Sequence, residues 1–178
     1  MRRHTGRRAI RGVIGAAAVA ALAVAMGGTA SAQPGQTDTG STTANVEVES
    51  SIALTGLTEA FTLTGLPGAT VVGLSAVTFN VETNNLGGYV VTVQGQGATL
   101  TPALVANPDS VPIGALSVRE TGTTPFTPLS STATVPVHSQ AVRSDEGGDD
   151  LANDYQVIVP FVNQDTYSTT LDYIATTL

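Results

Sequence analysis

The sequence predicts an all-β chain, an antiparallel β-sandwich of the immunoglobulin-like or Greek-key kind that follows a cleaved N-terminal signal helix. After residue 44, many short runs rich in Val and Thr alternate apolar with polar residues. Gly, Pro, Asn and Asp separate these runs, and no segment keeps an amphipathic helical period for more than about two turns. Because such alternation buries one face of each strand, it favours two sheets packed face to face.

Residues 1–32 have the order of a secretory signal peptide. Five arginines precede an apolar, Ala-rich run from Val13 to Met26, and Ala30-Ser31-Ala32 supplies the small residues that a signal peptidase needs. The run is too short to span a hydrocarbon core of ~30 Å comfortably, so we expect cleavage and no transmembrane segment in the mature chain. Arg7-Arg8 leaves twin-arginine export open beside the general route. The mature protein is expected to begin at Gln33 and to be secreted, extracellular or cell-wall associated.

The mature chain divides into a leader and one domain. Residues 33–43 are polar, with Gly, Pro, Ser and Thr and no apolar periodicity, which predicts a flexible leader. Residues 44–178 are long enough for a single β-sandwich domain with its own core.

The first half of this domain is expected to contain four strands. Asn84 to Gly88 reads as a turn, because Asn and Gly tolerate the positive φ of tight turns. Alternating residues predict a strand over Val46–Leu54, a short strand at Phe61 and Leu63, and a hairpin formed by Val77–Val81 and Tyr89–Val93.

The second half is expected to contain weaker strands and then two strong ones. Pro102, Pro108 and Pro112 break the chain after the hairpin into short pieces, because proline cannot donate to a sheet ladder. The sequence predicts edge strands at Leu116–Glu120 and Ala133–Val142, then strands around Tyr155–Val159 and Tyr167–Tyr173.

The charge of the mature chain excludes one class of partner. Five of the seven basic residues leave with the signal, so Arg119 and Arg143 face fourteen acids and the formal charge is 2 − 14 = −12. Such a surface repels phosphate backbones, so we expect no nucleic-acid binding. It also disfavours anionic lipids and anionic wall polymers unless a cation bridges them.

Residue types that are missing restrict how the protein could be anchored. Without cysteine the chain can form no disulfide and carries no lipobox, and without lysine it can form no internal Lys–Asn isopeptide bond. No LPxTG-like sorting signal precedes the end of the sequence. We expect any attachment to the cell surface to be non-covalent.

Groups for catalysis are scarce, and the sequence predicts that the protein is not an enzyme. His138 is the one histidine of the mature chain, and the Val, Thr and Ser around it favour a solvent-facing strand position. No Gly-x-Ser-x-Gly elbow is present, and no tryptophan offers a platform for sugars. An extracellular hydrolase or inhibitor stays open with His138 as its general base.

One acidic cluster is a weak calcium candidate. Calcium prefers six to eight oxygen ligands, and a loop that carries several carboxylates could supply them as a structural site. The spacing does not match an EF-hand, and a solvated hairpin tip that keeps neighbouring sheet edges apart explains the charge equally well. The candidate ligands are Asp145, Glu146, Asp149, Asp150 and Asp154.

Two segments that contain tyrosine carry a family pattern. Gly88-Tyr89-Val90-Val91-Thr92-Val93 and the segment from Asp165 to Ala175 resemble two strands of the WxL family of Gram-positive surface proteins. The first is similar to the family's Gly-Trp-x-Val-x-Val strand, and the second to its closing Gly-x-Tyr-x-x-x-Leu-x-Trp-x-Leu strand. Tyr89 and Tyr173 occupy the family's Trp positions, and Ala175 stands where the final Leu would be. The resemblance implies a β-sandwich held non-covalently at the cell wall.

Two functions are compatible with these observations. The first is a secreted, non-enzymatic cell-surface or cell-wall-associated β-sandwich protein, with a wall polymer or other surface proteins as partners and Tyr89 and Tyr173 near the binding face. Core packing is the alternative role for both tyrosines. The second function is a structural subunit of a surface fibre that self-associates by strand addition, in which a terminal strand joins the open sheet edge of a neighbour.

Overall fold

A computed structural model describes residue 35 and residues 37–178 of the chain. The predicted signal peptide, residues 1–32, lies outside the described residues. The chain divides between Asn45 and Val46 into two units, and the fold is that of the second unit, Val46–Leu178. Residues 37–51, which include most of the predicted leader, are exposed and belong to no strand.

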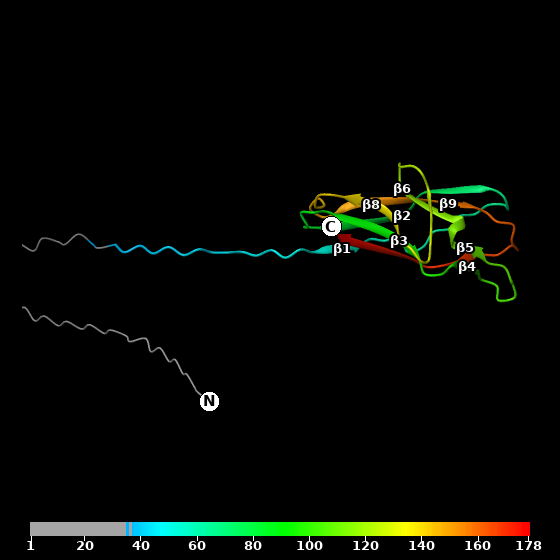
Figure 1. Cartoon of the computed structure of the whole chain (residues 1–178), viewed down its shortest axis with the longest axis horizontal. Helices are drawn as coiled ribbons and strands as arrows, with labels where there is room; N and C mark the ends of the chain where they lie inside the picture. The colour runs from blue at the N-terminus through cyan, green and yellow to red at the C-terminus, as the bar shows by residue number, and fades with distance from the viewer. Residues whose placement is uncertain (1–34, 36) are drawn as a thin grey trace, which may run out of the picture. The chain divides into compact units, whose positions relative to one another are not determined.

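The described residues form strands of 2 to 14 residues and one turn of 3-10 helix (Figure 1). No helix among them is long and apolar enough to span a membrane. The elements are β1 (Ile52–Thr55), β2 (Thr70–Thr83), β3 (Tyr89–Gly95), β4 (Thr99–Pro102), β5 (Val111–Pro112), η1 (Ile113–Ala115), β6 (Leu116–Glu120), β7 (Thr127–Pro128), β8 (Val135–Gln140), β9 (Asp149–Ile158), β10 (Tyr167–Ser168) and β11 (Leu171–Thr177).

The strands build an all-β sandwich of antiparallel sheets, as the alternation predicts. A five-stranded sheet has the order β1-β2-β9-β6-β7, and a three-stranded sheet has the order β11-β3-β8. A second three-stranded sheet, β10-β4-β5, is built from strands of two to four residues. The two larger sheets face each other, because the rings of Phe79 on β2 and Tyr173 on β11 lie 5.2 Å apart.

Alternation along the strands produces the core. On β3 the side chains of Tyr89, Val91 and Val93 are buried. On β2 Val77 and Phe79 are buried, while Thr78 between them is exposed. The core is filled mainly by valine and other branched aliphatic residues, which pack well on a pleated surface, and Phe79, Tyr89 and Tyr155 are its large aromatic members.

The predicted hairpin is wrong. β2 pairs with β1 and β9 in one sheet, whereas β3 pairs with β11 and β8 in the other, so the connection Asn84–Gly88 carries the chain across the core. Gly88 has φ +85°, and a Cβ there would overlap the backbone of Gln140 and Val142. Two strands that each bury one alternating face can lie side by side or face each other, and here they face each other.

The first predicted strand is also shorter than the pattern indicates. β1 begins only at Ile52, and Val46 and Val48 are 88% and 76% exposed. No described strand lies beside these valines to accept their backbone hydrogen bonds. The region of Phe61 and Leu63 forms no strand either, although both side chains are partly buried against the core.

The later predictions agree better with the structure. β6 has the predicted bounds, but it lies between β9 and β7 instead of at an edge. β8 falls inside the predicted segment Ala133–Val142 and does form an edge. β9 contains Tyr155, and the predicted last strand is interrupted, so that its residues form β10 and β11.

Candidate functional site

Tyr89 is not on a surface that could bind a ligand. Its side chain is fully buried, and its hydroxyl donates a 2.7 Å hydrogen bond to Asp149 Oδ2 on the facing sheet. Burial and this hydrogen bond raise the pKa of Tyr89 above its usual value. The predicted role of Tyr89 at a binding face is therefore wrong, and the alternative of core packing describes its position.

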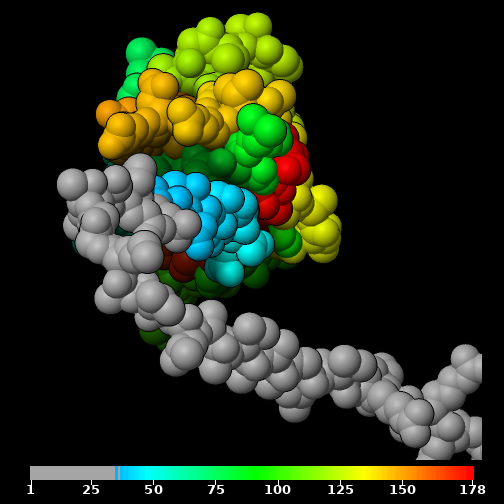
Figure 2. Space-filling model, turned by 90° about the vertical axis from the view of Figure 1, so that its left-hand side faces the viewer, coloured from blue at the N-terminus to red at the C-terminus, as the bar shows by residue number. Residues whose placement is uncertain are grey.

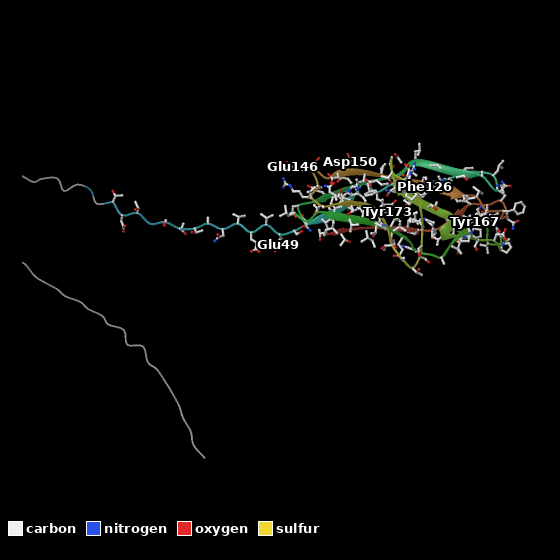
Figure 3. The ribbon with its side chains drawn as sticks, turned by 45° about the horizontal axis from the view of Figure 1, so that its top comes forward. Glu49, Phe126, Glu146, Asp150, Tyr167 and Tyr173 are labelled. Atoms are coloured by element: carbon white, nitrogen blue, oxygen red, sulfur yellow. The ribbon has the colours of Figure 1, made fainter. Side chains whose placement is uncertain are left out.

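Tyr173 is partly buried, and its ring points into the core. Its hydroxyl lies 2.6 Å from that of Tyr155, and its ring packs against Phe79. Figure 3 shows Tyr173 within the body of the domain. Like Tyr89, it offers no exposed aromatic platform to a wall polymer, so the predicted pair does not form a binding site.

The acidic segment from Asp145 to Asp150 forms a turn and the start of β9. Asp149 accepts hydrogen bonds from Tyr89, from the Gln140 side chain at 3.1 Å and from the Asp145 N–H at 3.1 Å. Burial raises the pKa of Asp149, but these hydrogen bonds outweigh it and leave the pKa below its usual value. Asp150 accepts a hydrogen bond from Asn80 at 2.9 Å. Both carboxylates thus accept hydrogen bonds from protein groups and help to fix the conformation of this turn.

Asp154 does not join the other acidic residues. It is 1% exposed and forms an ion pair with Arg119 at 2.9 Å. It also accepts hydrogen bonds from the N–H of Ser75 at 2.8 Å and from Thr121 at 2.7 Å. Ser75 has a positive φ of 46° where β2 shifts register, so Asp154 stabilises this bulge. The prediction that Asp154 is a calcium ligand is therefore wrong. Asp154 lies four residues beyond Asp150 along β9, and its carboxylate is already bound by protein groups.

The described part of the chain shows no group of three or more His, Asp or Glu side chains arranged to hold a metal ion. Glu49, Glu146 and Asp150 lie toward the same end of the domain (Figure 3), but their carboxylates do not converge. Figure 2 shows this end, with residues near 50 in cyan and residues near 150 in orange. The acidic cluster agrees better with the alternative of a solvated turn.

His138 is less exposed than its sequence context indicates. Its side chain is 13% exposed, and its Nδ1 lies 2.7 Å from Glu120 Oε1 at one side of a hollow of about 250 Å³. Its Nε2 is buried and has no hydrogen-bond partner among the described residues. In the part of the chain that the structure describes, no hydroxyl forms a hydrogen bond with this nitrogen, so His138 and Glu120 lack the third member of a catalytic triad there.

The segment that leads into β1 has the sequence pattern of a strand but is exposed and pairs with no described strand. We call Val46–Ser50 the tail segment. Its side chains are exposed, and its alternation of Val with Glu is the pattern of a half-buried strand. The side chain of Asn84 holds its end in place, because Nδ2 donates to Glu49 O at 2.8 Å and Oδ1 accepts from Ser51 N at 2.8 Å. Before Glu49 no hydrogen bond joins the tail segment to another described residue.

The edge strands of the described sheets differ in how well they are protected against pairing with another chain. β5, β7 and β10 have two residues each, β1 has four, and β8 carries Pro136 and a register shift. Short length, proline and bulges all discourage pairing with another chain. β11 has seven residues, keeps an unbroken register with β3, and contains neither Pro nor a basic residue. Among the described strands it is the one long and regular sheet edge without a hydrogen-bonded neighbour, although β1 of the facing sheet comes close to it.

No protein-family model matches the chain, and a search of curated proteins finds no match either. The resemblance to the WxL family therefore stays a prediction.

Sequence reasoning identified part of this arrangement. The alternation of Val46 and Val48 marks a strand-forming segment, and the fibre alternative assigns a terminal strand to strand addition. The open edge of β11 could not be read from the sequence, because an edge is defined by the strand that is missing beside it.

Proposed function

We propose that the protein is a secreted, non-enzymatic structural protein of the cell surface whose subunits assemble by strand addition. The observation that carries the proposal is the exposure of Val46 and Val48, at 88% and 76%, in a segment with strand-like alternation. Single exposed apolar residues are ordinary, but two on one face of an extended segment form an amphipathic strand without a sheet.

The segment has the two properties that strand addition needs. Its backbone N–H and C=O groups before Glu49 are free to form a ladder with another strand. Its two valines point to one side, so pairing with a sheet edge would bury them together and remove apolar surface from water. The signal-like order of residues 1–32 supports secretion, and therefore an assembly that forms outside the cell.

Subunit assembly explains the arrangement better than binding of a wall polymer by Tyr89 and Tyr173. Both tyrosine rings pack in the core, and their hydroxyls bond other protein groups. We therefore favour the fibre alternative over the WxL-like function. Attachment to the cell wall would then depend on the assembled fibre and not on these rings.

Electrostatic repulsion sets the conditions for assembly. The expected mature chain carries a formal charge of 2 − 14 = −12, so like subunits repel one another. Salt shortens the screening length to about 8 Å at physiological ionic strength, and assembly is expected to increase with ionic strength.

The test uses the expected mature chain, Gln33–Leu178, at rising concentration and salt. Light scattering after size-exclusion chromatography and negative-stain electron microscopy should show oligomers and filaments. Val46→Asp with Val48→Asp should leave a folded monomer, because two carboxylates replace the apolar face of the tail segment. The matched control, Glu47→Gln with Glu49→Gln, changes the opposite face and should assemble at least as readily. A native chain that stays monomeric under all conditions would overturn the proposal.

A further inference from the structure

We propose that the tail segment of one copy pairs antiparallel with the open edge of β11 in a second copy, in a head-to-tail arrangement. This inference rests on the proposed function and names its acceptor. The two surfaces are the tail segment, Val46–Ser50, and the outer edge of Leu171–Thr177.

The backbone of β11 is prepared to accept a strand. Gln96 N donates to Thr170 O, and Leu178 N donates to Gly88 O, so the even-numbered residues of β11 face β3 in hydrogen-bonded pairs. The odd-numbered residues therefore direct their N–H and C=O groups away from β3. Among the described residues these groups have no hydrogen-bond partner; they belong to Leu171, Tyr173, Ala175 and Thr177.

The side chains on this edge are suited to the valines of the tail segment. Leu171, Tyr173 and Ala175 point toward the core but stay only partly buried. β1 of the facing sheet comes close to β11 on this side, but the described residues form no backbone hydrogen bond between the two strands. In an antiparallel pair, residues directly opposite each other project from the same face. Val46 and Val48 then lie beside these residues and extend the apolar layer.

The directions of the strands favour a head-to-tail repeat. Ser51 bonds Asn84 and Leu178 bonds Gly88, so β1 starts and β11 ends at the same end of the domain. The two strands thus run in opposite directions. A neighbour in the same orientation presents β11 antiparallel to the incoming tail segment, which is the more stable pairing. Because donor and acceptor are different surfaces, the contact can repeat and generate an open filament.

Repulsion between acidic side chains on the solvent-facing side of the added strand and of β11 opposes this pairing. Glu47 and Glu49 lie on the same side as Asp172, and carboxylates close together repel. Gln96 donates a hydrogen bond to Asp172 Oδ1 at 2.8 Å, but its neutral amide leaves the negative charge of Asp172 in place. Asp172→Asn should therefore lower the salt concentration at which filaments form.

Engineered disulfides test the pairing, because the chain contains no cysteine of its own. Even-numbered residues of β11 form non-hydrogen-bonded pairs with the added strand, in which Cβ atoms lie about 4.5–5.5 Å apart, close to disulfide geometry. Glu47→Cys combined with Ile174→Cys should give a ladder of linked subunits on non-reducing gels after mild oxidation. The same donor combined with Asp172→Cys or Thr176→Cys reports the register.

The matched control places the second cysteine on the other edge of the same sheet. Ser139 on β8 is exposed, so Glu47→Cys combined with Ser139→Cys should give dimers from random collision but no ladder. A ladder from this control, without one from the β11 variants, would overturn the β11 acceptor and leave the proposed function standing. No ladder from any variant, together with monomers in scattering, would overturn both.

A proline variant tests the edge without cysteines. The N–H of Ala175 points away from β3, so Ala175→Pro removes a group that only an added strand would use. The variant should keep the circular dichroism spectrum of the monomer and lose filaments. Filaments that persist in this folded variant would contradict pairing at β11.

Discussion

The hydroxyl oxygens of Tyr155 and Tyr173 lie 2.6 Å apart, which joins β9 of the five-stranded sheet to β11 of the facing sheet. Tyr155 is fully buried and its ring packs against Phe61 at 4.4 Å. The edge strand that we propose as the acceptor, β11, is thus held to the core by a hydrogen bond between side chains. Loss of this hydrogen bond is expected to lower the stability of the domain.

Tyr173→Phe is expected to lower the free energy of unfolding by about 1–3 kcal/mol, because the buried hydroxyl of Tyr155 loses its partner. Urea denaturation of the native and variant chains measures the difference. Tyr167→Phe is the control and should cost less, since Tyr167 bonds Asn107 and Asn163 near the surface. The double variant Tyr155→Phe with Tyr173→Phe should cost less than the sum of the single changes. Additive costs would show that the two hydroxyls are not coupled.

Alkaline pH is expected to destabilise the fold through the same pair. Burial raises the pKa of Tyr155 from 10.0 to about 12, and the hydrogen bond with Tyr173 only partly opposes this shift. A group whose pKa is higher in the folded chain stabilises the fold fully below the unfolded pKa and loses that contribution as pH rises through the folded pKa. The free energy of unfolding should therefore fall between pH 10 and pH 12. Urea denaturation across this range, with the ultraviolet absorbance of tyrosinate, checks it; constant stability would contradict it.

Gly88→Ala is expected to destabilise the domain by about 2 kcal/mol more than Gly122→Ala. Both glycines have positive φ, +85° and +83°, so both variants carry backbone strain. Only at Gly88 does an added Cβ also overlap the backbone of Gln140 and Val142, whereas nothing lies within 4 Å at Gly122. Thermal and urea denaturation compare the two variants. Equal losses would mean that the crossing between the sheets tolerates a side chain.

Arg119→Met is expected to lower the free energy of unfolding by about 3–5 kcal/mol, because it leaves the carboxylate of Asp154 buried without its cation. Arg143→Met, at an exposed position, is the control and should change little. Urea denaturation at neutral pH measures both variants. An Arg119→Met variant as stable as the control would contradict the assigned role of the ion pair.

The same variant should show its effect in the pH dependence of stability. Burial raises the pKa of Asp154, but hydrogen bonds from Ser75 and Thr121 and the nearby Arg119 outweigh burial and lower the pKa below 3.8. Its contribution is therefore present above pH 3.8 and is lost as pH falls through the lower folded value. Without Arg119, the loss should begin at a higher pH. Acid titration followed by circular dichroism checks this shift.

The acidic residues show where sequence reasoning reached its limit. Asp149 and Asp154 follow each other closely in the sequence, yet Asp149 bonds Tyr89 and Asp154 bonds Arg119. The distance between the two carboxylates depends on the rise and the alternation of side chains along β9, and their partners depend on the strands that lie beside it. The partners of Asp154 come from Ser75, Arg119 and Thr121, which are remote in sequence. No local pattern reports such contacts.

The all-β class and the buried faces of β2, β3 and β11 follow from the sequence alone, because alternation with period two is a property of each strand by itself. The partner of each strand was decided only by the tertiary structure. The same alternation in Val77–Val81 and Tyr89–Val93 is satisfied beside or across a core, and Asn84–Gly88 takes the chain across it. The open edge of β11 and the unpaired Val46 and Val48 likewise depend on non-local hydrogen bonding, which selects the neighbours of a strand.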